Sequence, residues 1–257
     1  MTEPLSVAFD RDRNRAAFTL FHPKGNIVTR DMIAALRSAL DAVAENPHLK
    51  LITIEGAGGD FSFGASIPEH AAGEIGRVLP EMHALIYELL DVPAPTAAVV
   101  RGRCFGGGFE IALACDFILA EETASFALPE IALGVFPPAA SALLPMRVGY
   151  AAATRAILTG QSVEAAAWQM THLLEVVAKK GELAAAVDGW FAERLAPRSA
   201  AALRHATAAA RMGLVAHVRD LLPKLERLYL DDLMRTNDAI EGIEAFIARR
   251  APSWTDR

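Results

Sequence analysis

The sequence has few cysteines, no long apolar run and no surplus of positive charge. Its two cysteines, Cys104 and Cys115, are too few for a disulfide-rich secreted scaffold, which favours a reducing compartment. Proline or acidic residues interrupt the most apolar stretches, so none reaches the roughly 20 apolar residues of a membrane span. The N-terminal stretch lacks the basic-then-apolar pattern of a signal peptide. With 31 acidic against 25 basic residues the net charge is −6, opposite to that of a generic nucleic-acid binder. We therefore expect a cytoplasmic protein with neither a membrane nor a nucleic-acid partner.

Several catalytic motifs are absent as well. The seven histidines show no metal-ligand spacing and have no cysteine cluster near them, so we expect no metal site and read them as surface or core residues. The glycines fit neither of the common phosphate-binding loops, and the sequence contains no G-x-S-x-G nucleophile elbow. No histidine is spaced to form a dyad with Cys104, which favours a packed free thiol.

What is present is a composition that can bury a large core. Of the 257 residues 53% are hydrophobic and 22% are charged, which excludes wholesale disorder. Up to about residue 140, short β-rich runs alternate with two helical patterns, which begin near Thr29 and near Glu74. The β-rich runs predict strands over residues 7–9, 16–21, 49–55, 96–100 and 117–120.

From about Ala151 onward the chain is rich in alanine and leucine and is predicted to be helical, with one strand over residues 173–177. Glycine and proline are expected to mark the joints between these helices, at Gly160, Gly181, Pro197, Gly213 and Pro223. The pattern predicts an α/β core followed by a C-terminal helical region. We assign residues 1–195 to the core and residues 196–257 to the helical region.

Residues 56–66 form the first segment whose composition indicates a functional site. The segment directly follows a strong strand, and its glycines, including Gly64, let the backbone turn sharply and approach a ligand closely. For this segment taken alone, a plain strand-to-helix loop is the favoured interpretation, because such loops are common.

Residues 99–116 form the second segment, in which a predicted strand runs through three glycines, 106–108, into a helix. Unpaired N–H groups at a helix start, with the helix dipole behind them, suit developing negative charge. Glu110 lies in the first turn of this helix among apolar residues, where a solvated carboxylate is unexpected. The alternative is a glutamate that complements the dipole on an exposed helix start.

The third segment, residues 125–141, carries Glu130 in an otherwise apolar run. A carboxylate there is either buried with a raised pKa or lines a cavity, although a structural, hydrogen-bonded glutamate is also compatible. Two such glutamates, Glu110 and Glu130, each embedded in apolar sequence, favour paired acid–base chemistry.

Together the stretches FSFGAS, RGRCFGGGFEIALACD and FALPEIALGVFPP resemble the crotonase (enoyl-CoA hydratase/isomerase) superfamily. The resemblance extends from residues 22–26 to residues 241–250. It implies an α/β fold, a crotonase-type spiral of ββα units with a C-terminal helical trimerisation region. It also implies an acyl-CoA thioester substrate, no cofactor beyond the coenzyme A that the substrate carries, and a homotrimer or a hexamer built as a dimer of trimers.

The resemblance also implies roles for individual residues. The backbone N–H groups of Ala65 and Gly107 would form an oxyanion hole for the thioester oxygen. Glu110 and Glu130 match the two carboxylates of hydratase members, with Glu110 assigned as base and Glu130 as acid, although the roles could be exchanged. Residues expected to contact coenzyme A are Lys24, Ser62, Phe63, Ala65, Ile67, Phe246 and Arg249.

Two departures from the common hydratase motifs narrow the range of expected substrates. The chain has Phe63-Gly-Ala-Ser66 where many hydratases read A-G-A-D, and residues 137–141 are PPAAS where they read P-G-A-G-G. These features, with residues 228–234, resemble the subgroup that hydrates cyclohexa-1,5-diene-1-carbonyl-CoA to 6-hydroxycyclohex-1-ene-1-carbonyl-CoA in anaerobic benzoyl-CoA degradation. Two alternatives stay open: a hydratase or isomerase of another cyclic or linear enoyl-CoA, and a non-catalytic RNA-binding or scaffold relative, which the pI near 5.7 disfavours.

Overall fold

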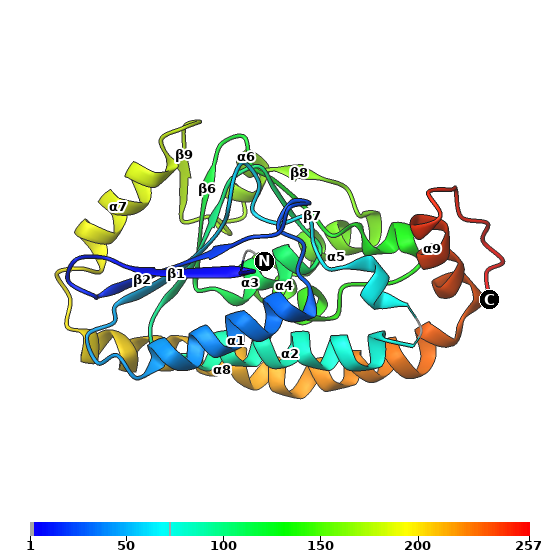
Figure 1. Cartoon of the computed structure of the whole chain (residues 1–257), viewed down its shortest axis with the longest axis horizontal. Helices are drawn as coiled ribbons and strands as arrows, with labels where there is room; N and C mark the ends of the chain where they lie inside the picture. The colour runs from blue at the N-terminus through cyan, green and yellow to red at the C-terminus, as the bar shows by residue number, and fades with distance from the viewer. Residues whose placement is uncertain (1–2, 72) are drawn as a thin grey trace.

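The structure, a computed structural model that describes residues 3–71 and 73–257, is built on a six-stranded sheet in the order β1-β2-β3-β4-β6-β9 (Figure 1). β1 and β2 pair antiparallel, and every later neighbour pairs parallel. A second, three-stranded sheet has the order β5-β7-β8. The bounds of the main-sheet strands are β1 Leu5–Phe9, β2 Arg15–Leu20, β3 Leu51–Gly56, β4 Thr96–Val100, β6 Phe117–Glu121 and β9 Val176–Ala178; the second sheet contains β5 Arg103–Phe105, β7 Ser125–Ala127 and β8 Val163–Glu164.

The main-sheet strands lie close to where the sequence predicts them. β4 occupies the predicted residues 96–100, and all five of its side chains are buried, as expected of a strand inside a parallel sheet. The prediction over residues 173–177 is only partly right, because the strand forms at Val176–Ala178 while Leu173 and Leu174 enter the core without pairing. The second sheet was not predicted, since strands of two or three residues carry too little periodicity to detect.

Three helices lie along one side of the sheet. α1 (Arg30–Ala44) packs on α2 (Ile75–Asp91), and α2 packs on α8 (Ala200–Arg227), so the three run side by side below the sheet in Figure 1. α1 begins where the sequence predicts, because the Thr29 hydroxyl accepts a hydrogen bond from the Met32 N–H at 3.3 Å and caps the helix. The other helices are α3 Gly107–Ala114, α4 Pro138–Val148, α5 Tyr150–Thr159, α6 Ala165–Gln169, α7 Leu183–Arg194 and α9 Asn237–Ile247.

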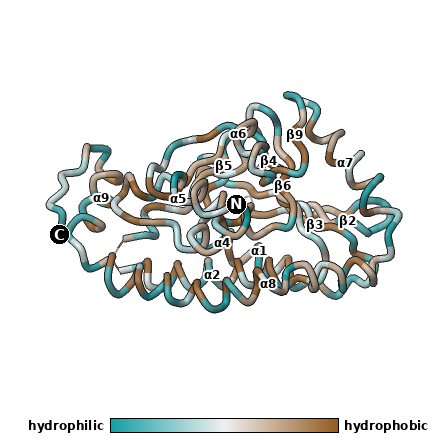
Figure 2. The backbone as a smooth tube through the Cα atoms, turned by 180° about the vertical axis from the view of Figure 1, so that it is seen from behind, coloured by the Kyte–Doolittle hydropathy of each residue, from teal (hydrophilic) through white to brown (hydrophobic). Residues whose placement is uncertain are grey.

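The predicted joints at Gly213 and Pro223 are wrong, because both residues lie inside α8. Glycine and proline disfavour a helix interior by about 1 and 3 kcal/mol, but here both lie on the exposed face. The opposite face is held by the buried residues Arg211, Val218 and Leu222. Figure 2 shows the result as alternating hydrophilic and hydrophobic colour along α8. Tertiary packing therefore outweighs the local propensity.

The expected division at residue 195 falls between α7 and α8. Since α8 packs back on α2 and α4, the helical region shares a core with the preceding part of the chain, and a separate C-terminal domain stays a prediction. Within the described residues, no helix combines the length and apolar character needed to cross a membrane.

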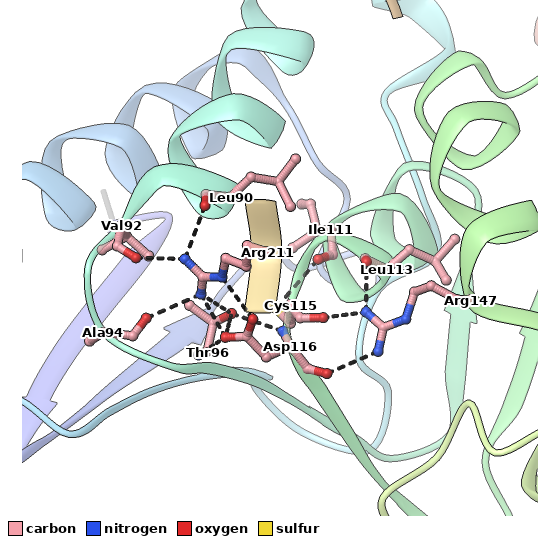
Figure 3. A network of polar contacts seen from close by, with 10 residues as sticks. All are labelled: Leu90, Val92, Ala94, Thr96, Ile111, Leu113, Cys115, Asp116, Arg147 and Arg211. Atoms are coloured by element: carbon pink, nitrogen blue, oxygen red, sulfur yellow. Dashed lines mark hydrogen bonds and ion pairs between the residues drawn. The ribbon is translucent and has the colours of Figure 1, made fainter. Parts of the chain in front are cut away.

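A buried ion pair anchors α8 to the sheet (Figure 3). Nε and Nη2 of Arg211 donate to the two carboxylate oxygens of Asp116 at 2.7 and 2.6 Å. Nη1 donates to the backbone carbonyls of Leu90 and Val92, at 3.1 and 2.6 Å. Asp116 also accepts from the Thr96 N–H at 2.7 Å. One guanidinium thus joins α8 to the end of α2 and to the starts of β4 and β6.

A second arginine completes this network (Figure 3). Arg147 of α4 donates to the backbone carbonyls of Leu113 at 2.8 Å and of Asp116 at 3.0 Å, and also to that of Cys115. These carbonyls form the end of α3 and the turn into β6, where a helix leaves them without internal partners. Arg147 therefore ties α4 to the end of α3.

We expect Arg211→Met to lower the free energy of unfolding by about 3–5 kcal/mol, because the Asp116 carboxylate and several carbonyls lose their buried donor. Urea denaturation measures this change. Arg219→Met is the matched control on the same helix: Arg219 bonds Asp91 at 2.6 Å, but the two side chains are 57% and 47% exposed. The control should cost less than about 1 kcal/mol. Equal losses in the two variants would contradict the anchoring role of Arg211.

Candidate active site

The predicted site residues converge on one cavity of about 1020 Å³. Its lining comes from the loop before α1, the loop after β3, the start of α3, the turn before α4, and the end of the chain around α9. This volume suits a large ligand, because small-molecule pockets measure roughly 300–1,000 Å³. The predicted site residues that line the cavity are Lys24, Phe63, Ala65, Ile67, Gly107, Glu110, Glu130, Phe246 and Arg249.

Among the predicted site residues, Ser62 lies outside the cavity lining. Its side chain is fully buried, and its hydroxyl donates to the Asn26 carbonyl at 2.7 Å and accepts from the Gly64 N–H at 3.1 Å. Ser62 therefore holds the loop that carries Ala65, and its contact with coenzyme A stays a prediction.

Glu110 lies in the first turn of α3 with 7% of its surface exposed, which rules out the exposed, dipole-complementing alternative. Its Oε1 accepts a hydrogen bond from the Ala140 N–H at 2.9 Å. Burial raises the pKa of this carboxyl, while the bond from Ala140 and the nearby His83 partly oppose the shift. Glu110 thus combines a fixed position with a higher affinity for protons than an exposed glutamate.

Glu130 lies in the 3₁₀ turn Pro129–Leu133 and reaches the glycine-rich start of α3. A Cβ atom on Gly106 would lie 2.8 Å from Glu130 Oε1, so the absence of a side chain there makes room for the carboxyl. Its Oε2 is buried and has no hydrogen-bond partner among the described residues. Burial and the charge of Glu110 raise the pKa of Glu130 to about 8. The charge state of Glu110 therefore influences the protonation of Glu130.

The backbone amides of Ala65 and Gly107 also lie on this cavity. A Cβ on Gly107 would be 3.3 Å from Ala65 Cβ and 3.4 Å from Ala65 N, so the two loops are in direct contact. Gly106, with φ of +50°, precedes the first residue of α3, and Gly107 therefore has no helical acceptor for its N–H. Among the described residues, no hydrogen bond uses the N–H of Ala65 or Gly107. The cavity thus offers two unpaired donors beside two carboxyls, at the positive end of a helix.

Cationic and aromatic side chains line another part of the cavity. The Phe63 ring covers Gly25, where a Cβ would lie 2.8 Å from the ring atoms, and the Arg103 guanidinium stands 4.9 Å from the ring centroid. Lys24 and Arg249 line the cavity with them. These cations and this ring suit a ligand that carries phosphates and an aromatic group.

Two polar residues at or near the cavity were not identified from the sequence. His83 of α2 is buried, and its Nδ1 lies 2.5 Å from Glu226 Oε2 of α8. No local pattern could reveal this pair, because the two residues are 143 positions apart. Tyr229 lines the cavity as well, and the signal that could have found it is a helical spacing that continues beyond Pro223. No group of three or more potential metal-ligating side chains is found within residues 3–71 and 73–257.

Comparisons with known proteins agree with this geometry. The sequence pattern of the enoyl-CoA hydratase/isomerase family matches residues 11–257. The cyclohexa-1,5-dienecarbonyl-CoA hydratase of Thauera aromatica is 41% identical over 256 residues, covering 100% of this chain and 98% of that protein. A carnitinyl-CoA dehydratase of Salmonella arizonae is 33% identical over 260 residues, covering 97% of this chain and 98% of that protein.

The fold matches as well. An enoyl-CoA hydratase from Mycobacterium avium subsp. paratuberculosis K-10, known from its crystal structure, superposes with a TM-score of 0.87 at 31% identity, covering 98% of this chain and 99% of that one. This confirms the expected crotonase-type fold, whereas trimerisation through the C-terminal helices stays a prediction. The chain therefore belongs to the enoyl-CoA hydratase/isomerase family and is a hydro-lyase that acts on an enoyl-CoA thioester.

Proposed function

We propose that the protein adds water to cyclohexa-1,5-diene-1-carbonyl-CoA and forms 6-hydroxycyclohex-1-ene-1-carbonyl-CoA, a step in anaerobic benzoyl-CoA degradation. The observation that carries the chemistry is a pair of carboxyls on one cavity beside two unpaired amides: Glu110, which is buried, and Glu130, which is half-buried with a buried Oε2. The choice of substrate rests on the relative from Thauera aromatica, whose identity of 41% exceeds the 33% of the carnitinyl-CoA dehydratase.

The oxyanion hole is the first part of the proposed mechanism. The thioester oxygen accepts hydrogen bonds from the N–H groups of Ala65 and Gly107, so the carbonyl withdraws electrons from the conjugated ring. Negative charge grows on this oxygen as the reaction proceeds, and each preorganised donor contributes about 2.7–4 kcal/mol toward the transition state.

The two glutamates then move the protons. Glu110 takes one proton from water as the water oxygen bonds to the ring carbon β to the thioester carbonyl. The electrons of that double bond move into a dienolate that ends on the thioester oxygen. Glu130, kept protonated by burial and by its neighbour, gives its proton to the far end of the dienolate, and the carbonyl re-forms. The ring thereby gains the hydroxyl of the water and the proton of Glu130. The proton left on Glu110 then returns to Glu130, directly or through solvent, and restores the starting state.

We assign coenzyme A to the part of the cavity lined by Lys24, Phe63, Ile67, Phe246 and Arg249. Lys24 and Arg249 supply positive charge for phosphate oxygens, and the Phe63 ring, already under Arg103, offers a flat apolar face. The assembly is a homotrimer or a hexamer in this proposal. A second candidate is hydration of another enoyl-CoA, which the carnitinyl-CoA dehydratase relatives favour.

Glu110→Gln and Glu130→Gln should each lower kcat by about 10²–10⁴-fold with little change in KM, since the amide keeps the shape but cannot exchange the proton. A steady-state assay with the dienoyl-CoA measures this. Glu121→Gln is the control, because Glu121 is also 7% exposed but is not part of the cavity lining. Its carboxylate accepts a hydrogen bond of 3.0 Å from the Gly181 N–H. Near-normal rates in either test variant would refute the assignment.

The pH–rate profile should be bell-shaped. Glu110 must be charged to act as base, so activity falls as pH drops below its raised pKa. Glu130 must be protonated to act as acid, so activity also falls as pH rises past about 8. The measurement is kcat/KM between pH 5 and pH 10. A rate that stays constant through the alkaline half of this range would exclude Glu130 as the acid.

In heavy water, the position of deuterium in the product identifies the substrate chemistry. Hydration of the diene by the proposed route leaves deuterium on the ring carbon opposite the one that carries the new hydroxyl. Ordinary enoyl-CoA hydration leaves it on the carbon next to the thioester carbonyl. Nuclear magnetic resonance of the products from dienoyl, monoenoyl and crotonyl thioesters distinguishes the two. Turnover of crotonyl-CoA without turnover of the diene would favour the second candidate.

A further inference from the structure

Tyr229 is a polar residue of the cavity that the proposed mechanism does not use. It lines the same cavity as Glu110 and Glu130, and only 2% of its surface is exposed. Among the described residues, no hydrogen bond uses its hydroxyl. A buried tyrosine hydroxyl normally finds a partner, because leaving it unpaired costs free energy. The hydroxyl is therefore available for a partner inside the cavity.

The fold fixes the position of this ring. The buried residues of α8 and its extension are Thr207, Arg211, Val218, Leu222 and Tyr229, at successive intervals of four, seven, four and seven. Tyr229 therefore continues the face that Arg211 anchors. It lies in a single π-helical turn, Leu228–Asp232, a feature that is rare and frequently found at functional sites.

Apolar contacts surround the Tyr229 ring. The ring meets Phe136 edge-on, with centroids 5.5 Å apart and planes at 67°. It belongs to an apolar cluster that includes Ile75, Leu79 and Val135. These contacts hold the ring whether or not it carries a hydroxyl, so packing accounts for an aromatic residue here but not for a tyrosine.

The electrostatic setting keeps the hydroxyl protonated. Burial, followed by the charges of Glu130 and Glu110, raises the pKa of Tyr229 above its ordinary value. Both carboxyls line the same cavity as this hydroxyl. A hydroxyl that keeps its proton stays neutral, and its oxygen can accept a hydrogen bond without competing for the proton that the glutamates exchange.

We infer that the Tyr229 hydroxyl holds the attacking water. A bound water needs two to four polar partners, and Glu110 accepts only one of its hydrogens. The Tyr229 oxygen accepts the second hydrogen, which leaves a lone pair of the water oxygen facing the substrate. This inference rests on the proposed hydration, because it assigns a partner to the water in that reaction.

The proton balance of the reaction stays unchanged. The water O–H bond that breaks is the one directed to Glu110, and the C–O bond forms on the substrate. The hydrogen held by Tyr229 stays on the oxygen and becomes the hydroxyl hydrogen of the product. The phenolic proton of Tyr229 is not transferred, so the residue orients the water without being a proton carrier.

Tyr229→Phe tests this role, because it removes the hydroxyl and keeps the ring. We expect kcat to fall by about tenfold, which is the effect of one lost hydrogen bond, with KM and melting temperature unchanged. The value of kcat should fall by the same factor at every pH, because the raised pKa of Tyr229 keeps its hydroxyl protonated across that range. Tyr150→Phe is the control, since Tyr150 is 78% exposed and lies outside the cavity lining.

Three results would overturn the inference: an unchanged kcat, a lower melting temperature that accounts for the lost activity, or a shifted pH profile. The last would mean that the hydroxyl acts on the carboxyls and not on water. The assay uses whichever enoyl-CoA the unaltered enzyme hydrates. A wild-type enzyme that hydrates crotonyl-CoA but not the diene would defeat the proposed substrate and still leave Tyr229 testable.

Discussion

Two carboxyl groups share an apolar cavity without a full counter-charge, and the proposed chemistry of the protein depends on that arrangement. Desolvation makes it costly to ionise either group, and repulsion makes it costlier to ionise both. Burial therefore raises the pKa of both groups, and the charge of Glu110 raises that of Glu130 further, to about 8. Such a pair contains an acid and a base at once, which is what addition of water requires.

The surrounding fold maintains this unfavourable arrangement by fixing the backbone on every side. Arg147 binds the carbonyls at the end of α3, and the helix that it stabilises carries Glu110 at its other end. Ala140, in the helix that carries Arg147, donates its N–H to Glu110. Arg211 anchors α8, whose buried face leads to Tyr229. Most polar interactions that stabilise the fold thus lie behind the cavity, and within it Glu130 Oε2 has no hydrogen-bond partner among the described residues.

Local sequence signals explain most of the sheet and half of the site. The Thr29 cap, the buried run of β4 and the glutamates in apolar sequence are each visible within a few residues. Residues that depend on distant partners could not be found in this way. Ser62 lies in a segment that is predicted to contact the ligand, yet its hydroxyl donates to the backbone carbonyl of Asn26. His83 meets Glu226 from another helix, and Gly213 stays helical because residues on the opposite face are buried.

The crowded glycine turn at the start of α3 restricts how the enzyme can be redesigned. A methyl group on Gly106 would press against Glu130, and one on Gly108 would come within 2.5 Å of Ser62 Cβ. Alanine at Gly106 would displace the Glu130 carboxyl at a positive φ, and alanine at Gly108 would collide with Ser62, so this turn tolerates little variation. Other lining residues, such as Val78, Leu79 and Met82 of α2, are better placed to change the shape of the cavity for a bulkier or slimmer acyl group. Libraries aimed at new thioester substrates should diversify that helix and leave the glycines intact.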